Sequence, residues 1–328
     1  MARWHWLVPT ALAASLFVGC GGGGRGGNGS IGDRVIATIP VGDLPVGIAV
    51  DSQRNRVYVC NRTSDNISIV DGEANAVIAS MPIGDYPQSI AVNTTTNRIY
   101  VLHGLNQTQV SVVNGDTFDT ISTFSVGSSG MGLRNLAVNS LTDEVFVAGG
   151  ARYYRIDGST YQILGSLFPV GSGISGIAVD DATGKVYLSG TGDDLVIINS
   201  ATDTVVKAMP LSEVSGCCVA VDKTTHKVYM TDNVRGNAVI IDQNNDYSLS
   251  LVSVGGEPSE VAVNSVTNKA YVCRGQGNSV GVIDGSTNQV VASIPTGGGS
   301  TAIAINETNN RAYVTDGYGD TVTVIQGL

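Results

Sequence analysis

The chain alternates short apolar runs with polar turns, and the same runs return in a fixed order. One of them is RVYVCN at 56–61. Variants of it follow at 98–103, 144–149, 185–190, 227–232, 269–274 and 311–316. Apolar runs of this length, rich in Val and Tyr and bounded by Asn, Asp and Gly, predict β-strands. No apolar pattern with a helical period follows residue 19, so we expect an all-β fold.

A second run, IAV followed by Asp or Asn, marks the same repeat. It and its variants stand at 48–51, 90–93, 136–139, 177–180, 219–222, 261–264 and 303–306, in steps of 42, 46, 41, 42, 42 and 42 residues. A third run is ISIVDG (67–72) with its counterparts, and a fourth is VIASMPIG (77–84) with its near copy VVASIPTG (290–297). Four strands per repeat predict a blade, and seven repeats predict a seven-bladed β-propeller.

The seventh repeat reaches Leu328 without a fourth strand, whereas RVIATIPVG (34–42) has the fourth-strand pattern before the first repeat. We therefore expect the N-terminal strand to complete the last blade and close the ring. Closure leaves no long sheet edge open to aggregation. The expected organisation is a segment to be removed at 1–19, a tether at 20–33 and a propeller at 34–328.

Two strand positions keep one kind of residue in every repeat. The first strand carries Ala at 49, 91, 137, 178, 220, 262 and 304, and the second carries an aromatic residue at 58, 100, 146, 187, 229, 271 and 313. A small residue suits the innermost strand, where blades converge, and an aromatic ring in every repeat predicts packing between blades. The Asp or Asn that closes the first strand is expected to start a turn by accepting backbone N–H groups.

The first residues have the pattern of an export signal. MARWHW supplies one positive charge, and LVPTALAASLFV is apolar but too short to span a bilayer. Cys20 follows, and then the Gly-rich segment 21–32, which is expected to be a flexible tether. FVG before Cys20 resembles the lipobox of bacterial lipoproteins, although Phe17 stands where that family usually has Leu. The resemblance implies a diacylated Cys20, and the alternative is plain secretion.

Charge narrows the possible partners. The net charge of −10 becomes −11 when residues 1–19, with Arg3, are removed, and no basic run occurs. An acidic chain is a poor ligand for nucleic acid or anionic lipid. We expect a monomer, exported to the outer membrane or cell surface as a periplasm-facing or extracellular lipoprotein. It would contact the membrane through its lipid anchor only.

The repeat resembles a known family. YVCN (58–61), YVTD (313–316) and the preceding IAV[DN] runs look like the YVTN-type β-propeller repeat of surface-layer and exported proteins. The resemblance covers residues 34–328 and implies the propeller fold. It says little about function, because the shared residues are those expected to pack the ring.

Function is therefore sought where the repeats differ, on the face that we call the top. It carries the loops from each second strand to the third and from each fourth strand to the next blade. The largest difference is GSSGMGLRN (127–135), followed by RYYRIDG (152–158). An aromatic and cationic patch of the kind common at binding hot spots is predicted there, with a locally paired Arg155 in a divergent blade as the alternative. Its candidates are Met131, Arg134, Arg152, Tyr153, Tyr154 and Arg155.

The four cysteines after Cys20 lie in a compartment that permits disulfides. Cys217 and Cys218 are adjacent and could form a vicinal disulfide, a feature that some quinone-dependent dehydrogenase propellers place under their cofactor; structural or free thiols are the alternative. Cys60 and Cys273 hold the same strand position in non-neighbouring blades, so we expect buried thiols rather than a bond.

A metal site is a further alternative. Lactonase and sugar-acid propellers bind a divalent cation near the axis, and oxygen ligands of the kind that calcium takes could come from four residues: Asn61, Asp232, Glu260 and Asp316. Arg274 lies between them in the ring, which speaks against the site. No Ser-His-Asp spacing, haem motif or phosphate loop occurs.

We expect an interaction or display module without a cofactor, binding an envelope protein or polysaccharide. The alternative is an envelope enzyme of lactonase, lyase or quinoprotein-dehydrogenase type that uses the axial mouth.

The anchor can be tested by fractionation. Cys20→Ala removes the acylation site, and acyl chains contribute roughly 0.8 kcal/mol per buried methylene to membrane binding. We expect the variant to move from the membrane fraction to the soluble fraction. A variant that stays with the membrane contradicts lipidation at Cys20.

Overall fold

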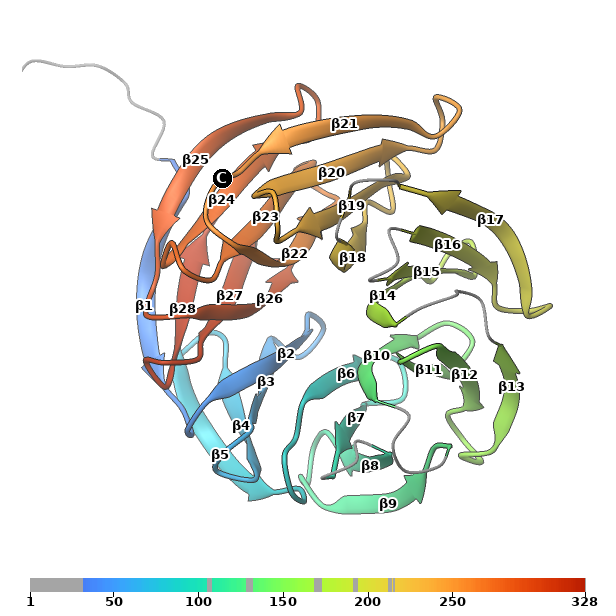
Figure 1. Ribbon diagram of the computed structural model, residues 1–328. Helices are drawn as coiled ribbons and strands as arrows, with labels where there is room; N and C mark the ends of the chain where they lie inside the picture. The colour runs from blue at the N-terminus through green and yellow to red at the C-terminus, as the bar shows by residue number, and fades with distance from the viewer. Residues whose placement is uncertain are drawn as a thin grey trace, which may run out of the picture. The chain divides into compact units, whose positions relative to one another are not determined.

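Each repeat folds into a four-stranded antiparallel sheet, and the sheets stand around a common axis (Figure 1). This computed structural model describes residues 32–327 except 105–107, 128–131, 168–172, 191–193, 212–213 and 215, and also leaves out the side chains at 194, 216 and 217. The described residues form seven sheets from 28 strands, which confirms the predicted seven-bladed β-propeller. No helix in this part of the chain is long and apolar enough to cross a bilayer.

The two inner strands of each blade match the first two runs of the repeat. The innermost strands are β2 (Pro45–Asp51), β6 (Ser89–Asn93), β10 (Leu133–Asn139), β14 (Ile174–Asp180), β18 (Gly216–Val221), β22 (Pro258–Asn264) and β26 (Ser300–Asn306). The second strands are β3 (Arg56–Asn61), β7 (Arg98–His103), β11 (Glu144–Gly149), β15 (Lys185–Gly190), β19 (Lys227–Asp232), β23 (Lys269–Arg274) and β27 (Arg311–Asp316).

The two outer strands complete each blade. The third strands are β4 (Asn66–Asp71), β8 (Gln109–Asn114), β12 (Arg152–Asp157), β16 (Asp194–Asn199), β20 (Asn237–Asp242), β24 (Ser279–Asp284) and β28 (Thr321–Gln326). The outermost strands are β5 (Ala76–Pro82), β9 (Thr120–Ser125), β13 (Ile163–Leu167), β17 (Thr204–Pro210), β21 (Ser248–Ser253), β25 (Gln289–Pro295) and β1 (Arg34–Pro40).

The ring closes as the sequence predicted. Strand β1 pairs antiparallel with β28, from Arg34 opposite Gln326 to Pro40 opposite Thr321. Bonds between the first and last blades support the closure: Thr301 Oγ1 donates to the Pro45 carbonyl at 2.8 Å. Just before β1, Lys269 Nζ lies 3.1 Å from a carboxylate oxygen of Asp33. The N-terminal strand is therefore bonded to two neighbouring blades.

The turns after the innermost strands have the expected chemistry. Asp51 Oδ1 accepts the backbone N–H groups of Gln53 at 2.9 Å and Arg54 at 3.1 Å. Asn55 then adopts a left-handed φ of 51°, which Asn tolerates better than most residues. The same side-chain acceptor opens the equivalent turns at Asn93, Asn139, Asp180, Asp222, Asn264 and Asn306.

The aromatic ring of each second strand packs between two blades, as predicted. Each ring is nearly fully buried and pairs across the sheet with the Ala that recurs in every innermost strand, as Tyr58 does with Ala49. In five blades its hydroxyl lies beside the residue that follows the third strand of the next blade: Tyr100, Tyr187, Tyr229, Tyr271 and Tyr313. Tyr100 Oη donates to the Gly158 carbonyl at 3.1 Å. Burial raises the pKa of Tyr58 to about 12, so the hydroxyl stays protonated.

The residue in that turn depends on the ring that faces it. A Cβ built on Gly72, Gly285 or Gly327 would lie 2.8, 2.7 or 2.6 Å from the facing tyrosine oxygen. It would also lie 2.5, 2.0 or 2.7 Å from Oδ1 of an Asn in the same blade, namely Asn55, Asn268 or Asn310. These positions therefore have room only for glycine. Where the facing ring is Phe146, the equivalent turn residue is Ser200, and where it is Tyr187 the residue is Gln243. Gln243 Nε2 donates to Tyr187 Oη at 3.1 Å. At these blade boundaries the turn residue therefore matches the ring that faces it.

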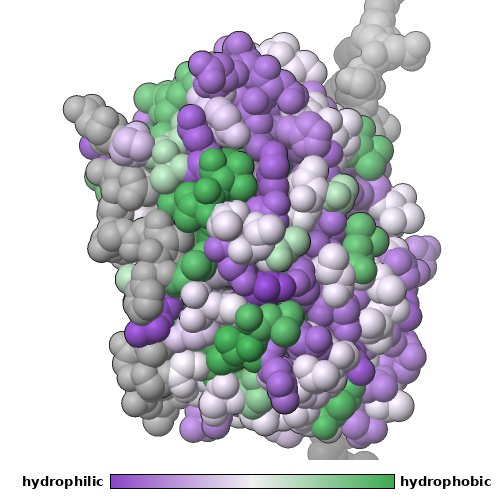
Figure 2. Space-filling model, turned by 90° about the vertical axis from the view of Figure 1, so that its right-hand side faces the viewer, coloured by the Kyte–Doolittle hydropathy of each residue, from purple (hydrophilic) through white to green (hydrophobic). Residues whose placement is uncertain are grey.

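The outermost strands are irregular in a repeated way. In six blades a register shift leaves one aliphatic residue unpaired in the outermost strand, and these residues are 37–55% exposed: Ile36, Ile78, Ile121, Leu164, Val206 and Val291. Bulges of this kind twist an edge and hinder pairing with another chain. The side of the ring that carries β13 and β17 shows its apolar surface as separate patches among polar residues (Figure 2).

The match between ring and turn can be tested with two alanine variants. Gly285→Ala would place a methyl group 2.0 Å from Asn268 Oδ1 and 2.7 Å from Tyr229 Oη, and we expect a loss of about 1–3 kcal/mol in the free energy of unfolding. Ser200→Ala, which faces Phe146, is the matched control and should cost less than about 1 kcal/mol. Urea denaturation measures both, and equal losses contradict the steric account.

Candidate functional site

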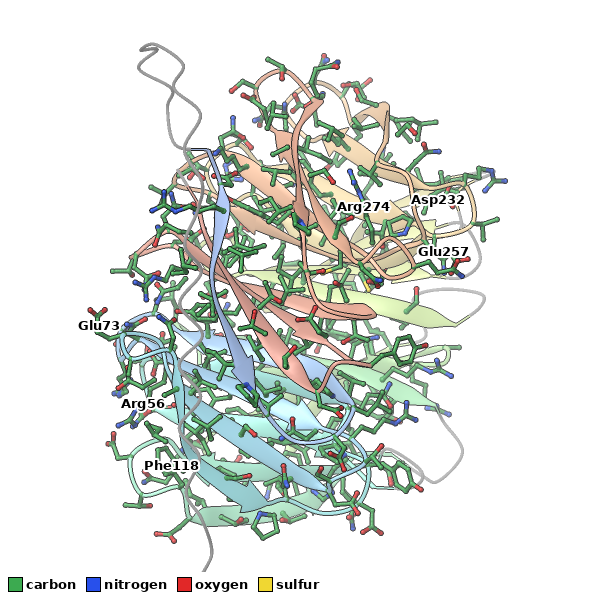
Figure 3. All side chains as sticks on the ribbon, turned by 90° about the vertical axis from the view of Figure 1, so that its left-hand side faces the viewer. Arg56, Glu73, Phe118, Asp232, Glu257 and Arg274 are labelled. Atoms are coloured by element: carbon green, nitrogen blue, oxygen red, sulfur yellow. The ribbon has the colours of Figure 1, made fainter. Side chains whose placement is uncertain are left out.

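The two faces of the ring differ in their chemistry. Glu73, Arg56 and Phe118 lie at one end of the molecule, on the bottom face, and Asp232, Glu257 and Arg274 lie at the other end, on the top face (Figure 3). On the bottom face, the cation at the start of a second strand bonds the next blade: Arg98 Nη1 donates to the Gly158 carbonyl at 2.6 Å. Similar bonds run from Arg56, Lys227 and Arg311. Bottom-face cations are therefore engaged in joining blades.

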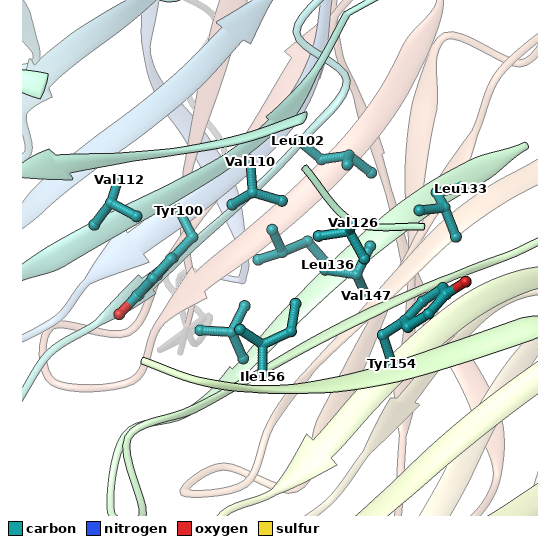
Figure 4. Close-up of a cluster of buried hydrophobic side chains, with 11 residues drawn as sticks. Tyr100, Leu102, Val110, Val112, Val126, Leu133, Leu136, Val147, Tyr154 and Ile156 are labelled. Carbon is teal, nitrogen blue, oxygen red and sulfur yellow. The ribbon is translucent and has the colours of Figure 1, made fainter. Parts of the chain in front are cut away.

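The two tyrosines of the predicted patch are buried. Tyr153 has no exposed surface and stacks on Phe146, with ring centroids 5.9 Å apart. Tyr154 is 5% exposed and points to the other side of the same sheet, into a cluster that holds Leu133 and Val147 (Figure 4). Neighbouring residues of a strand face opposite ways, so the two rings enter separate cores and present no common surface. A shared aromatic contact surface was the wrong expectation for this pair.

Arg155 is held by two carboxylates, which was the alternative interpretation of this residue. Its Nη2 lies 2.7 Å from Asp203 Oδ2 in the next blade, and its Nη1 lies 2.8 Å from Glu144 Oε1. The hydrogen bonds to Asp203 raise the pKa of Arg155. Glu144 begins its second strand where the other blades have Arg or Lys. Arg155 thus supplies the cation that this blade boundary lacks, and it is not part of a contact surface.

The two other arginines of the predicted patch differ in their exposure. Arg134 is exposed in β10 and lines the mouth of the axial channel, whereas Arg152 is half-buried at the start of β12. Met131 lies outside the described residues. Of the patch candidates that the structure describes, Arg134 lines an open hollow, and binding by Arg134, Arg152 or Met131 stays a prediction.

The polar residues that end the second strands point back into their own blades. Asn61 Nδ2 donates to Asn66 Oδ1 at 2.7 Å and to Ser68 Oγ at 2.8 Å. Asp316 Oδ2 accepts from Thr323 Oγ1 at 2.6 Å and from Thr321 Oγ1 at 3.2 Å. Both side chains are fully buried. Burial raises the pKa of Asp316.

His103 ends the second strand of its blade in the same manner. Its Nε2 lies 2.7 Å from Ser111 Oγ, which lies 2.8 Å from Thr123 Oγ1. His103 is 4% exposed, and burial lowers its pKa. This chain of polar groups crosses the blade from the buried His103 in the second strand to the exposed Thr123 in the outermost strand.

The four candidate metal ligands therefore do not converge. Asn61, Asp232 and Asp316 lie in different blades, and Arg235 Nη1 lies 3.6 Å from Asp232 Oδ2. Glu260 is half-buried and lines the axial mouth. Within the described residues, no three His, Cys, Asp or Glu side chains gather in one place to hold an ion. The residues present do not fit a single calcium site.

The cysteines are placed as follows. Cys60 and Cys273 are fully buried in blades that are not neighbours, and burial raises the pKa of both thiols. Cys218 is half-buried, and its backbone N–H donates to Thr231 Oγ1 at 3.1 Å. The side chain of Cys217 lies outside the described residues, and so does Cys20. A vicinal disulfide and lipidation stay predictions.

The axial mouth on the top face is a polar site that sequence reasoning found only in part. It is a hollow of about 300 Å³, and its lining includes Arg62, Gln88, Arg134 and Glu260. Arg62 lies over the ring of Tyr86, with its guanidinium carbon 6.0 Å from the ring centroid. Arg62 was missed because it follows a second strand like any solvated turn residue. Its place near Arg134 depends on ring closure, which brings loops of different blades together.

The top face has a second hollow that the sequence did not point to. It measures about 580 Å³ and lies across the loops of the fifth, sixth and seventh blades. We call it the Tyr318 groove and define it by Asn233, Glu257, Gln276, Asn278, Gly299 and Tyr318. Tyr318 is 86% exposed. A single Tyr in a Gly-rich turn is the only signal of it in the sequence.

The role of Arg155 can be tested by restoring the pattern of the other blades. Arg155→Ile leaves two carboxylates without their cation, and we expect the free energy of unfolding to fall by about 2 kcal/mol or more. Adding Glu144→Arg returns a cation to the position that Arg98 holds one blade earlier, and should recover most of the loss. Chemical denaturation measures both. A double variant no more stable than Arg155→Ile contradicts compensation across the boundary.

Comparisons with known proteins agree with the fold and leave the family open. No protein-family model and no curated protein sequence matches the chain, so the YVTN-type resemblance stays a prediction. Among solved structures, hydrazine synthase of Kuenenia stuttgartiensis is similar, with a TM-score of 0.76 and 16% sequence identity over 86% of this chain and 95% of that chain. At that identity the likeness shows a shared β-propeller fold, and nothing about activity.

Proposed function

We propose that the chain is an exported, lipid-anchored propeller that binds an envelope protein or glycan with its top face. The observation that carries this proposal is the axial mouth, where Arg62 of the first blade and Arg134 of the third line one polar hollow. Arg134 is exposed and Arg62 half-buried. Cations in a concave polar site suit the carboxylate, amide or hydroxyl groups of a hydrophilic partner.

The use of polar residues elsewhere in the ring supports a binding role. Asn61, His103 and Asp316 are occupied by bonds within their blades, and Arg155 is occupied at a blade boundary. These residues keep the ring rigid and do not face a substrate. Rigid presentation lowers the entropy that is lost when a partner binds.

The enzyme alternative rests on the same axial mouth, because a cofactor or metal would have to sit there. Glu260 lines this mouth and would be the acidic residue closest to a reaction there. Elemental analysis and absorbance of the natively purified protein separate the two proposals. A stoichiometric metal or chromophore would favour the enzyme and would count against a display module.

The binding face can be tested by photocrosslinking in intact cells. Val234 on the top face and Val266 on the bottom face are 72% and 74% exposed, and form a matched pair for a photoreactive amino acid. We expect crosslinked products from Val234 and from Tyr86 beside the axial mouth, because the top face makes the contact.

Val266 and Leu141, a second exposed bottom residue, serve as controls and should give no specific product. Products from these positions alone would place the partner on the wrong face. Specific crosslinks at none of the four positions would contradict a display module.

A further inference from the structure

The Tyr318 groove is a hollow built by three blades. Its volume of about 580 Å³ falls within the range of small-molecule sites, whereas a protein partner buries about 800 Å² of each surface. Its walls come from loops that enter or leave the second and innermost strands of adjacent blades. Its shape therefore rests on the packing of the ring.

The aromatic ring of Tyr318 is an exposed flat surface in this groove. The side chain is 86% exposed, although large aromatic residues are usually buried. A Cβ on Gly299 would lie 2.4 Å from Tyr318 Cδ2, so the ring rests against this glycine, whose φ is +68°. The Tyr318 N–H donates to the Gly298 carbonyl at 3.0 Å. One edge of the ring is supported by backbone, and the rest is open to a ligand.

Polar groups surround the ring of Tyr318. Asn278 is anchored because its Oδ1 accepts the Gly299 N–H at 3.0 Å. Asn233, Gln276 and Glu257 are exposed along the same groove. Among the described residues that line the groove, Glu257 alone carries a charge. Amides and one carboxylate bond neutral hydroxyl groups well, and an acidic ligand would be repelled by Glu257 and by the net charge of −10.

We propose that the Tyr318 groove binds a neutral oligosaccharide. The apolar C–H face of one sugar ring lies on Tyr318, and Asn233, Gln276 and Glu257 bond its hydroxyl groups. The inference rests on the proposed binding function and names a glycan as the ligand and this groove as its site. A protein partner would use the remainder of the top face.

The test is calorimetric titration of the purified full-length chain with chitotriose, cellotriose and maltotriose, with trigalacturonate as the acidic comparison. We expect at least one neutral trisaccharide to bind and trigalacturonate to bind more weakly. Tyr318→Ala should weaken that binding roughly tenfold, and Tyr318→Phe, which keeps the ring, by no more than about threefold. Val266→Ala, at a 74% exposed position on the bottom face, is the control and should leave the affinity unchanged.

Two results would overturn the proposal: no binding of any neutral trisaccharide, or unchanged binding by Tyr318→Ala. Circular dichroism of the variant excludes misfolding as the reason for a loss. Crosslinks from Val234 in cells, together with no sugar binding in solution, would refute the glycan site and leave the display module standing. Failure of both experiments would refute the proposed function as well.

Discussion

The ring depends on the contact between the aromatic side chain of each second strand and the turn of the next blade. A blade is one thin sheet, and without its neighbours it would leave apolar side chains on both faces in water. Burial of each large aromatic ring contributes on the order of 2–3 kcal/mol. Since every ring reaches across a boundary, as Tyr100 does to Gly158, no blade is stable without the next. The repeat thus preserves the contact between neighbouring blades, which we call the joint, as well as the strand pattern.

Each joint has adapted in its own way. Phe146, which has no hydroxyl, faces Ser200 instead of glycine, and Gln243 supplies an amide to the oxygen of Tyr187. Within one blade, the Arg274 guanidinium lies over Gly281, where a Cβ would be 2.6 Å from Arg274 Nη2. Such paired changes explain how the repeats diverge in sequence while the geometry of the ring is kept.

The fold was predictable from the sequence because its signals are local and repeated. A run such as RVYVCN indicates a strand, a buried aromatic residue and a following turn within six residues. Seven copies make the prediction of the strand more certain than one copy would. Closure was predictable because 34–42 has the pattern missing at the other end.

The candidate site was not predictable in the same way. Tyr153 and Tyr154 stood out in composition, but alternation along β12 sends them into two cores. Asp203, the partner of Arg155 in the next blade, is 48 residues away in the sequence. A short sequence pattern does not reveal a contact over such a separation. Arg62 and Tyr318 are ordinary turn residues in the sequence. They line a hollow only because the closed ring brings loops of different blades together.

Closure by β1 also orders the folding of the chain. Pairs within a blade join neighbouring strands and form early, whereas Arg34 must wait for Gln326 before the last sheet is complete. Until then β28 presents an unpaired edge and β1 has no partner, so a chain that lacks its C-terminal strand is open to proteolysis and to association with other chains. The last sheet is therefore complete only in a chain that holds both β1 and β28.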